Sequence, residues 1–127
     1  MNRRAAIACF HLALAVSLGA LGAHFLKAEL SGDSLASFQT GVRYHIYHSL
    51  ALLILALWDA PMKLRIQWNT MHIGMLLFSF SIYLLSTRGL LLPDGAFKWL
   101  GPITPLGGVL LIASWLFLGI HFLRSRT

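Results

Sequence analysis

Four long apolar stretches run along the chain, and short polar stretches with most of the charged residues separate them. They cover approximately residues 5–26, 37–58, 68–87 and 104–123. Each approaches the ~20 residues that an α-helix needs to cross the ~30 Å hydrocarbon core of a bilayer. The pattern predicts an all-α, polytopic membrane protein: a single membrane domain, residues 1–127, built as a bundle of four transmembrane helices.

Local signals indicate where these helices begin and end. Asp33 or Ser34 is the expected N-cap of the second helix, which then begins slightly before its apolar stretch. The turn signal at 93–95 follows the third helix. Thr104 is the expected N-cap of the fourth, with Pro105 as its first helical residue.

The first stretch has two interpretations. It follows Arg3 and Arg4 and contains small residues near its end, as a cleavable signal peptide does. It is longer, however, than the ~7–15 residue apolar region of a signal peptide. Ala15, Gly19 and Ala23 also recur at four-residue spacing, which is typical of a face that packs closely on another helix. An uncleaved transmembrane helix is therefore the favoured interpretation.

Composition supports a membrane protein and argues against two other classes. Hydrophobic residues make up 57% of the chain and charged residues 11%, which is far from the balance of a small soluble domain. The net charge is +6, but the basic residues lie in pairs at the ends of apolar stretches rather than in a stripe with aromatics, so no nucleic-acid partner is expected. The single cysteine excludes an internal disulfide, a CxxC redox pair and a thiolate metal cluster.

The basic residues also predict the orientation. Six of the ten Lys and Arg residues flank the N-terminus, the loop between the second and third stretches, and the C-terminus: Arg3, Arg4, Lys63, Arg65, Arg124 and Arg126. The other side has Lys27, Arg43, Arg88 and Lys98, together with three of the four acidic residues. The positive-inside rule therefore predicts that both termini are cytoplasmic.

Polar residues gather in the first half of the second stretch. A charged residue at the centre of a span costs ~2.5–3.5 kcal/mol on insertion scales, so such residues usually face the bundle interior or a water-filled cavity. Gly41, His45 and His48 lie at i, i+4 and i+7 on one helical face, and Arg43 and Tyr47 share a neighbouring face. If the first two helices form an antiparallel hairpin, the end of the first helix approaches this region.

This arrangement predicts a polar hub in the outer half of the bundle, formed by His24, Arg43, Tyr44, His45 and His48. As a functional site the hub would bind a metal or relay protons, because imidazole is a good ligand and titrates near neutrality. As a structural feature, its histidines would hydrogen-bond to hydroxyls on the third helix and fix the packing. The structural interpretation is favoured, and no metal site is assigned. The candidate hydroxyls are Ser79, Ser81, Tyr83 and Ser86.

The remaining polar residues give no catalytic site or cofactor site. His11, His72 and His121 fall toward the cytoplasmic side, and an interfacial position explains His72 and His121. Their spacing does not single out a haem-binding pair, so no cofactor is expected. Ser49 and Ser114 lack the surroundings of a catalytic nucleophile, and no phosphate-binding loop is present. The chain is not expected to be an enzyme.

Four sequence blocks carry a resemblance to a known family: Gly19-Ala-Leu-Gly22-Ala23-His24, Thr40-Gly41-Val-Arg43-Tyr44-His45-Ile-Tyr47-His48-Ser49-Leu-Ala51, Ser79-Phe-Ser81-Ile-Tyr83 and Ile103-Thr104-Pro105-Leu-Gly107-Gly108. In this order they resemble the small membrane family catalogued as domain of unknown function four-two-three, which includes a short eukaryotic transmembrane relative. The resemblance implies four spans, an uncleaved first helix and a bacterial inner (plasma) membrane location. It supplies no accepted activity.

The chain departs from the family pattern at three positions. His45 stands where the family usually has glutamine, and Phe80 and Ser114 stand where glycine is common. An amide in place of His45 argues against obligatory metal ligation by that residue. His24 and His48 are then the better candidates for a shared role.

The leading functional hypothesis is a non-enzymatic protein that packs with itself or with another membrane protein and affects membrane or envelope integrity. Its expected partners are the lipid bilayer and either a second copy of the chain or another membrane protein. The glycines expected to allow close helix packing are Gly19, Gly22, Gly41, Gly107 and Gly108. The alternative is a small transporter or ion-conducting protein whose polar hub lines the path. Since four helices enclose little volume, such a path would require oligomerisation.

Overall fold

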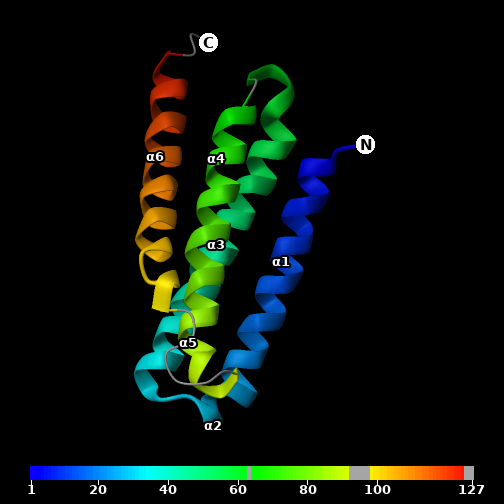
Figure 1. Ribbon diagram of the computed structural model, residues 1–127. Coiled ribbons are helices and arrows are strands. Elements are labelled where there is room, and N and C mark those ends of the chain that lie inside the picture. The colour runs from blue at the N-terminus through cyan, green and yellow to red at the C-terminus, as the bar shows by residue number, and fades with distance from the viewer. Residues whose placement is uncertain (63, 92–97, 125–127) are drawn as a thin grey trace.

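The computed structural model describes residues 1–62, 64–91 and 98–124, and within these ranges it contains helices and no strand. The described chain forms four long helical segments joined by short connections (Figure 1). The first comprises α1 (Arg3–Leu21), η1 (Gly22–Leu26) and α2 (Lys27–Glu29), and the second is α3 (Gly32–Met62). The third comprises α4 (Arg65–Met75), η2 (Leu76–Phe80) and α5 (Ser81–Leu91), and the fourth comprises η3 (Lys98–Leu100) and α6 (Ile103–Arg124).

The segments run antiparallel, as short connections between helices require. The start of α1, the α3–α4 connection and the end of α6 lie at one end of the molecule, whereas α2 and the end of α5 lie at the other (Figure 1). We call these the terminal end and the α2 end. Helix α1 packs mainly on α3, which also packs on the third segment, and α6 packs on α4 and η2. Helices α1 and α6 therefore flank opposite sides of the group.

Three of the described helices are long and apolar enough to cross a membrane: Arg3–Glu29, Arg65–Leu91 and Lys98–Arg124. Helix α3 has 31 residues, which exceeds the ~20 that a span requires. Its first half carries the polar residues noted above, which lower its hydropathy, and two of these, His45 and His48, are buried. The chain is thus an all-helical protein with membrane-length apolar helices.

Two helix starts differ in detail from the sequence-based predictions. The N-cap of α3 is Ser31, whose hydroxyl accepts a hydrogen bond from the backbone N–H of Ser34 at 3.3 Å. Asp33 instead lies in the first turn, where its charge complements the helix dipole. Helix α6 begins at Ile103, so Thr104 lies inside it, and its hydroxyl hydrogen-bonds to that of Ser81 at 2.6 Å. The predicted turn at 93–95, together with Lys63 and Arg126, lies outside the described residues.

The buried apolar residues form two clusters with a polar layer between them. The larger cluster occupies the half toward the terminal end and comprises Ala8, Leu52, Leu55, Ala56, Leu64, Trp68, Met71, Met75, Leu111 and Leu118. The smaller lies toward the α2 end and comprises Leu26, Phe38, Val42 and Tyr83. His45, Ser49 and Ser79 fall between the clusters along their helices, and each is 0% exposed. The candidate site passes through this layer.

Candidate functional site

Three histidines and one tyrosine form a continuous line of hydrogen-bond contacts through the interior. Nε2 of His72 on α4 lies 3.0 Å from Nε2 of His11 on α1. Nδ1 of His11 lies 3.1 Å from Nε2 of His45 on α3, and Nδ1 of His45 lies 3.0 Å from the hydroxyl of Tyr83 on α5. We call these four residues the histidine chain. It joins the first three helical segments to one another.

Small residues on α1 make room for the ring of His11. Ala8 and Ala15 are both fully buried, and they lie three residues before and four residues after His11 on the same helical face. One turn further along this face, a Cβ atom at Gly19 would lie 3.3 Å from Val42. The backbone of α1 therefore approaches α3 closely enough for His11 to reach His45.

Trp68 supports the other end of the line. Its ring centroid is 4.8 Å from that of His72, and its indole N–H donates to the carbonyl of Leu52 at 2.9 Å. The Arg4 guanidinium lies 5.7 Å from the Trp68 ring centroid. His72 is half-buried, whereas His45 is 0% exposed. The line thus runs from a partly accessible ring at His72 to a fully buried one at His45.

The ring geometry favours hydrogen bonding over metal coordination. His11 meets the other two rings edge-on, with interplanar angles of 64° to His45 and 72° to His72. Both nitrogens of His11 and both of His45 already face a partner within the line. Among the residues that the structure describes, no group of three or more His, Cys, Asp or Glu side chains is arranged to hold a metal ion.

His48 lies outside this line and makes a different kind of contact. Its Nε2 accepts a hydrogen bond from the Trp115 indole at 3.2 Å, and its Nδ1–H donates to the Tyr44 carbonyl at 2.7 Å. An indole can only donate and a carbonyl can only accept, so the ring is neutral with its proton on Nδ1. His48 therefore links α3 to α6 through a hydrogen bond that can be made in one direction only.

The structure does not bring the other predicted hub residues into the line. His24 is exposed on η1, two residues from each of the buried Gly22 and Leu26, and a two-residue step on a helix points to nearly the opposite side. Arg43 is also exposed, and its guanidinium donates to the Thr40 hydroxyl on its own helix at 3.3 Å. Tyr44 is 41% exposed, with its ring against Phe78.

Sequence reasoning missed His11 and His72. His11 lies four residues before Ala15, so the small-residue face predicted on the first helix includes it when extended by one turn. His72 lies four residues after Trp68 and three residues before Met75, and both of these neighbours are buried. The available signal was this shared helical face. Both were instead predicted to lie toward the cytoplasmic side, and His72 at the interface, away from the predicted hub.

Glycines bring the helices together around the site. A Cβ atom at Gly107 would overlap the backbone nitrogen of Phe78 and lie 2.8 Å from its Cα. A Cβ at Gly41 would lie 3.0 Å from the Tyr83 ring, and one at Gly22 would lie 3.2 Å from Phe38. All three contacts are tighter than ordinary van der Waals contact. A larger residue at Gly107 would push the helices apart because backbone atoms occupy the space, whereas at Gly41 and Gly22 a neighbouring side chain would have to shift.

Two further glycines differ from this group. A Cβ at Gly108 would lie 3.6 Å from the Phe78 ring, which is ordinary contact. Gly74, which the sequence did not single out, lies where a Cβ would be 3.0 Å from the backbone nitrogen of Leu111. Gly74 and Gly107 therefore bring α6 close to the third segment from opposite sides of the contact.

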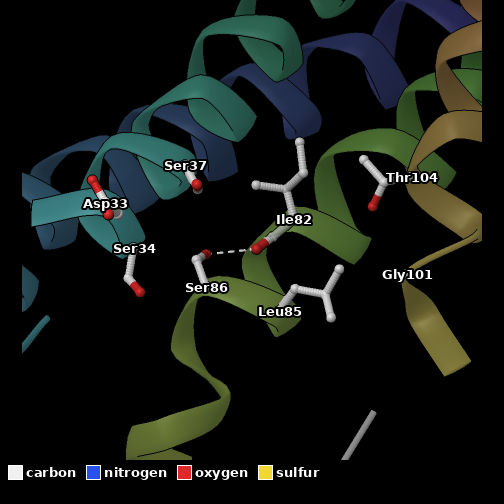
Figure 2. Close-up of a pocket in the computed structure, with 8 residues that line it drawn as sticks. All are labelled: Asp33, Ser34, Ser37, Ile82, Leu85, Ser86, Gly101 and Thr104. Atoms are coloured by element: carbon white, nitrogen blue, oxygen red, sulfur yellow. Dashed lines mark hydrogen bonds between the residues drawn. The ribbon is translucent and has the colours of Figure 1, made fainter. Parts of the chain in front are cut away.

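A second polar region lies near the α2 end, in a cavity of about 400 Å³ between α3, α5 and the start of α6 (Figure 2). Asp33, Ser34 and Ser37 line one side, opposite Ser86 and Ile82 (Figure 2). The Ser86 hydroxyl donates to the Ile82 carbonyl of its own helix at 2.5 Å. This hydroxyl is thus engaged within α5, and the region does not form a second line of contacts.

Sequence comparison places the chain among membrane proteins. The profile of a family described as "Protein of unknown function (DUF423)" matches residues 18–108. UPF0382 membrane protein YwdK of Bacillus subtilis is 39% identical over 109 residues, covering 83% of each chain. UPF0382 membrane protein SH2409 of Staphylococcus haemolyticus is 34% identical over 107 residues, covering 83% of this chain and 82% of the relative. No solved structure matches. The chain belongs to the DUF423 family of membrane proteins.

Proposed function

We propose that the chain crosses the inner membrane of a bacterial cell four times, with both termini in the cytoplasm. The antiparallel arrangement supports this, because it groups both ends of the described chain with the α3–α4 connection (Figure 1). Arg3, Arg65 and Arg124 belong to this end, and an excess of basic residues marks the cytoplasmic side. Buried polar residues on α3 are compatible with a fourth span, since they face the bundle interior.

In this membrane the chain acts by packing, without catalysing a reaction, and its main partner is a second copy of itself. The observation that carries this proposal is an exposed stripe of small residues on α1: Ala6, Cys9, Ala13, Ser17 and Ala20. The stripe lies on the side of α1 opposite Ala8 and Ala15, which pack on α3. We call it the α1 stripe.

A small-residue stripe suits association inside a bilayer. Lipid tails are as apolar as leucine side chains, so helices gain little from hydrophobicity when they meet there. Close backbone approach and van der Waals packing drive the association instead, and small residues permit both. The exposed face of α6, in contrast, is covered with large residues such as Leu106, Ile112 and Phe117, which suit contact with lipid tails.

Cysteine crosslinking in native membranes tests this proposal directly. Cys9 lies on the α1 stripe and is the only cysteine of the chain. If two stripes pack against each other, mild oxidation gives a disulfide-linked dimer. The matched control combines Cys9→Ser with Ile112→Cys, which moves the thiol to the exposed face of α6, and should remain monomeric. Monomer alone from Cys9 and from Ala13→Cys would contradict self-association, and an adduct of another mass would indicate a different partner.

The proposed role of such an assembly is to maintain the integrity of the membrane or envelope. Cells that lack the protein should then become more sensitive to detergent, and the wild-type chain should restore resistance. Ala13→Leu should fail to restore it, because the larger side chain keeps two stripes apart. Val16→Leu, a similar change at a large exposed position beside the stripe, should restore it. If both variants restored resistance equally, the role in envelope integrity would not depend on packing of the α1 stripe.

A further inference from the structure

Each contact in the histidine chain can be made in two senses. A neutral imidazole has one N–H donor and one bare acceptor nitrogen, and a tyrosine hydroxyl can donate or accept. In one sense His72 donates to His11, His11 donates to His45, and His45 donates to the Tyr83 oxygen. In the other, every donor and acceptor is exchanged. Both arrangements satisfy all three contacts with every ring neutral.

His48 shows by contrast why this matters. Its indole donor and its carbonyl acceptor permit only one tautomer, so it cannot pass a proton along. The histidine chain has no such fixed donor or acceptor within its three contacts. A purely structural contact needs only a fixed donor and acceptor, as at His48. A path for protons needs contacts that can be made in both senses, as in the histidine chain.

We propose that the histidine chain is a proton relay between His72 and the cavity beside Tyr83. A proton binds Nδ1 of His72, and the proton on its Nε2 moves to Nε2 of His11. The proton on His11 Nδ1 moves to His45 Nε2, the proton on His45 Nδ1 moves to the Tyr83 oxygen, and the hydroxyl releases its original proton. One proton enters and one leaves. The histidine chain is then left in its opposite sense, and it returns to the starting sense when its rings and hydroxyl reorient.

The Tyr83 end has a place for the released proton. Tyr83 lines a cavity of about 530 Å³ near the α2 end, between the first helical segment and α5. The other lining residues are mostly apolar, but Glu29 is among them, and its carboxylate can accept a proton. The same cavity is therefore lined both by the buried Tyr83 and by the exposed Glu29.

The relay passes through the buried polar layer of the bundle. His72 and Tyr83 are eleven residues apart on one continuous helical segment, which corresponds to about 16 Å along its axis. That is about half of the ~30 Å hydrocarbon core. Members of both apolar clusters, Met75 and Tyr83 among them, belong to this stretch, so a proton there is guided along the polar side chains. This function goes beyond packing and does not depend on self-association.

Purified full-length protein in vesicles tests the relay. The vesicles contain a pH-sensitive dye, and a potassium diffusion potential made with valinomycin drives protons inward. The wild-type chain should acidify the interior faster than protein-free vesicles. His45→Gln keeps one donor and one acceptor in the line but cannot accept and release a proton as imidazole does. It should lower the protein-dependent rate roughly a hundredfold, the lower end of what a positioned acid–base group contributes.

His24→Gln is the matched control, because it makes the same chemical change at an exposed histidine outside the line, and it should keep the wild-type rate. If His45→Gln fails to fold, Tyr83→Phe provides the second test, since it removes only the hydroxyl and should also abolish the protein-dependent rate. A wild-type rate equal to that of protein-free vesicles would overturn the proposal. A wild-type rate in a folded His45→Gln or Tyr83→Phe variant would do the same.

Nitrogen NMR of the reconstituted protein gives an independent readout. A relay requires His11, His45 and His72 each to populate both neutral tautomers, whereas His48 should show only the Nδ1–H form. A single tautomer at all three positions would therefore overturn the relay even if the vesicles acidified.

Discussion

Gly107 lies where α6 meets η2, and its missing side chain sets how closely these helices approach. The backbone nitrogen and Cα of Phe78 occupy the space that a Cβ atom would take. Backbone atoms cannot move aside as the end of a flexible side chain can, so a substitution there displaces a whole helix. Gly119, on the same helix, has nothing within 4 Å of its Cβ position. The same residue type thus has different roles at the two sites.

Gly107→Ala should therefore destabilise the protein by about 1–3 kcal/mol, the usual cost of overpacking a well-packed interior. Gly119→Ala, the matched control, should leave stability unchanged or slightly raise it, because alanine favours the helix more than glycine does. Reversible unfolding in mixed detergent micelles measures both free energies. Equal stability of the two variants would show that α6 does not pack on η2 through Gly107.

Trp115→Phe should weaken the joint between α3 and α6, because phenylalanine has no N–H to donate to His48. Hydrogen bonds between transmembrane helices contribute ~0.6 kcal/mol on average, and the expected loss is of that size. A double-mutant cycle with His48→Phe isolates the pair from the other contacts of each ring. A coupling energy of zero would mean that the two side chains do not interact.

At the scale of elements, α1 illustrates how a helix can look dispensable in the sequence and still be part of the core. Its basic start and apolar run resemble a signal peptide. In the structure it contributes the fully buried Ala8 and Ala15 and the central ring of the histidine chain. Asn2, just before it, also donates from its side chain to the Ala56 carbonyl at 2.9 Å.

The protein isolated from membranes should for this reason retain α1. Intact-mass spectrometry of a chain carrying a C-terminal tag gives the answer without disturbing the fold. The mass should correspond to a chain that includes residues 3–21. A mass that places the first residue after Leu21 would mean that α1 is removed, and the histidine chain could not then exist in the mature protein.

The sequence predicted more of the helical elements than of the candidate site. Apolar length and charge placement predicted the long helical segments, because both reflect the solvent that the helices face. They could not predict that Ser31 rather than Asp33 caps α3, since both residue types suit that position. The π-helical turns η1 and η2 also have no simple sequence signature, and they change the direction of the residues that follow.

The site was harder to predict because it depends on which helices meet. The spacing of His45 and His48 indicated buried histidines, and Tyr83 was among the hydroxyls proposed as their partners; the structure joins it to His45. His11 comes from a helix 34 residues earlier and His72 from one 27 residues later, so no local pattern links them to His45. Helical faces can be read from one sequence, but the pairing of faces between helices cannot.

At the scale of the whole molecule, the helices form a group in which α1 and α6 are the flanking members (Figure 1). The large exposed residues of α6 and the small ones of the α1 stripe give these two flanks different surfaces. The proposed lipid-facing side and the proposed partner-facing side rest on this difference. Both uses require the helices to cross the bilayer.

Single-cysteine labelling in intact cells tests that claim most directly. In a Cys9→Ser background, cysteines replace Ser31, Arg65 and Gly101 one at a time, and a membrane-impermeant maleimide is added outside. Four crossings with cytoplasmic termini predict labelling of the residue 31 and residue 101 variants, whereas the residue 65 variant reacts only after the membrane is opened. Labelling at residue 65 in intact cells, with protection at residue 101, would mean that α3 does not cross the bilayer and would rule out the four crossings.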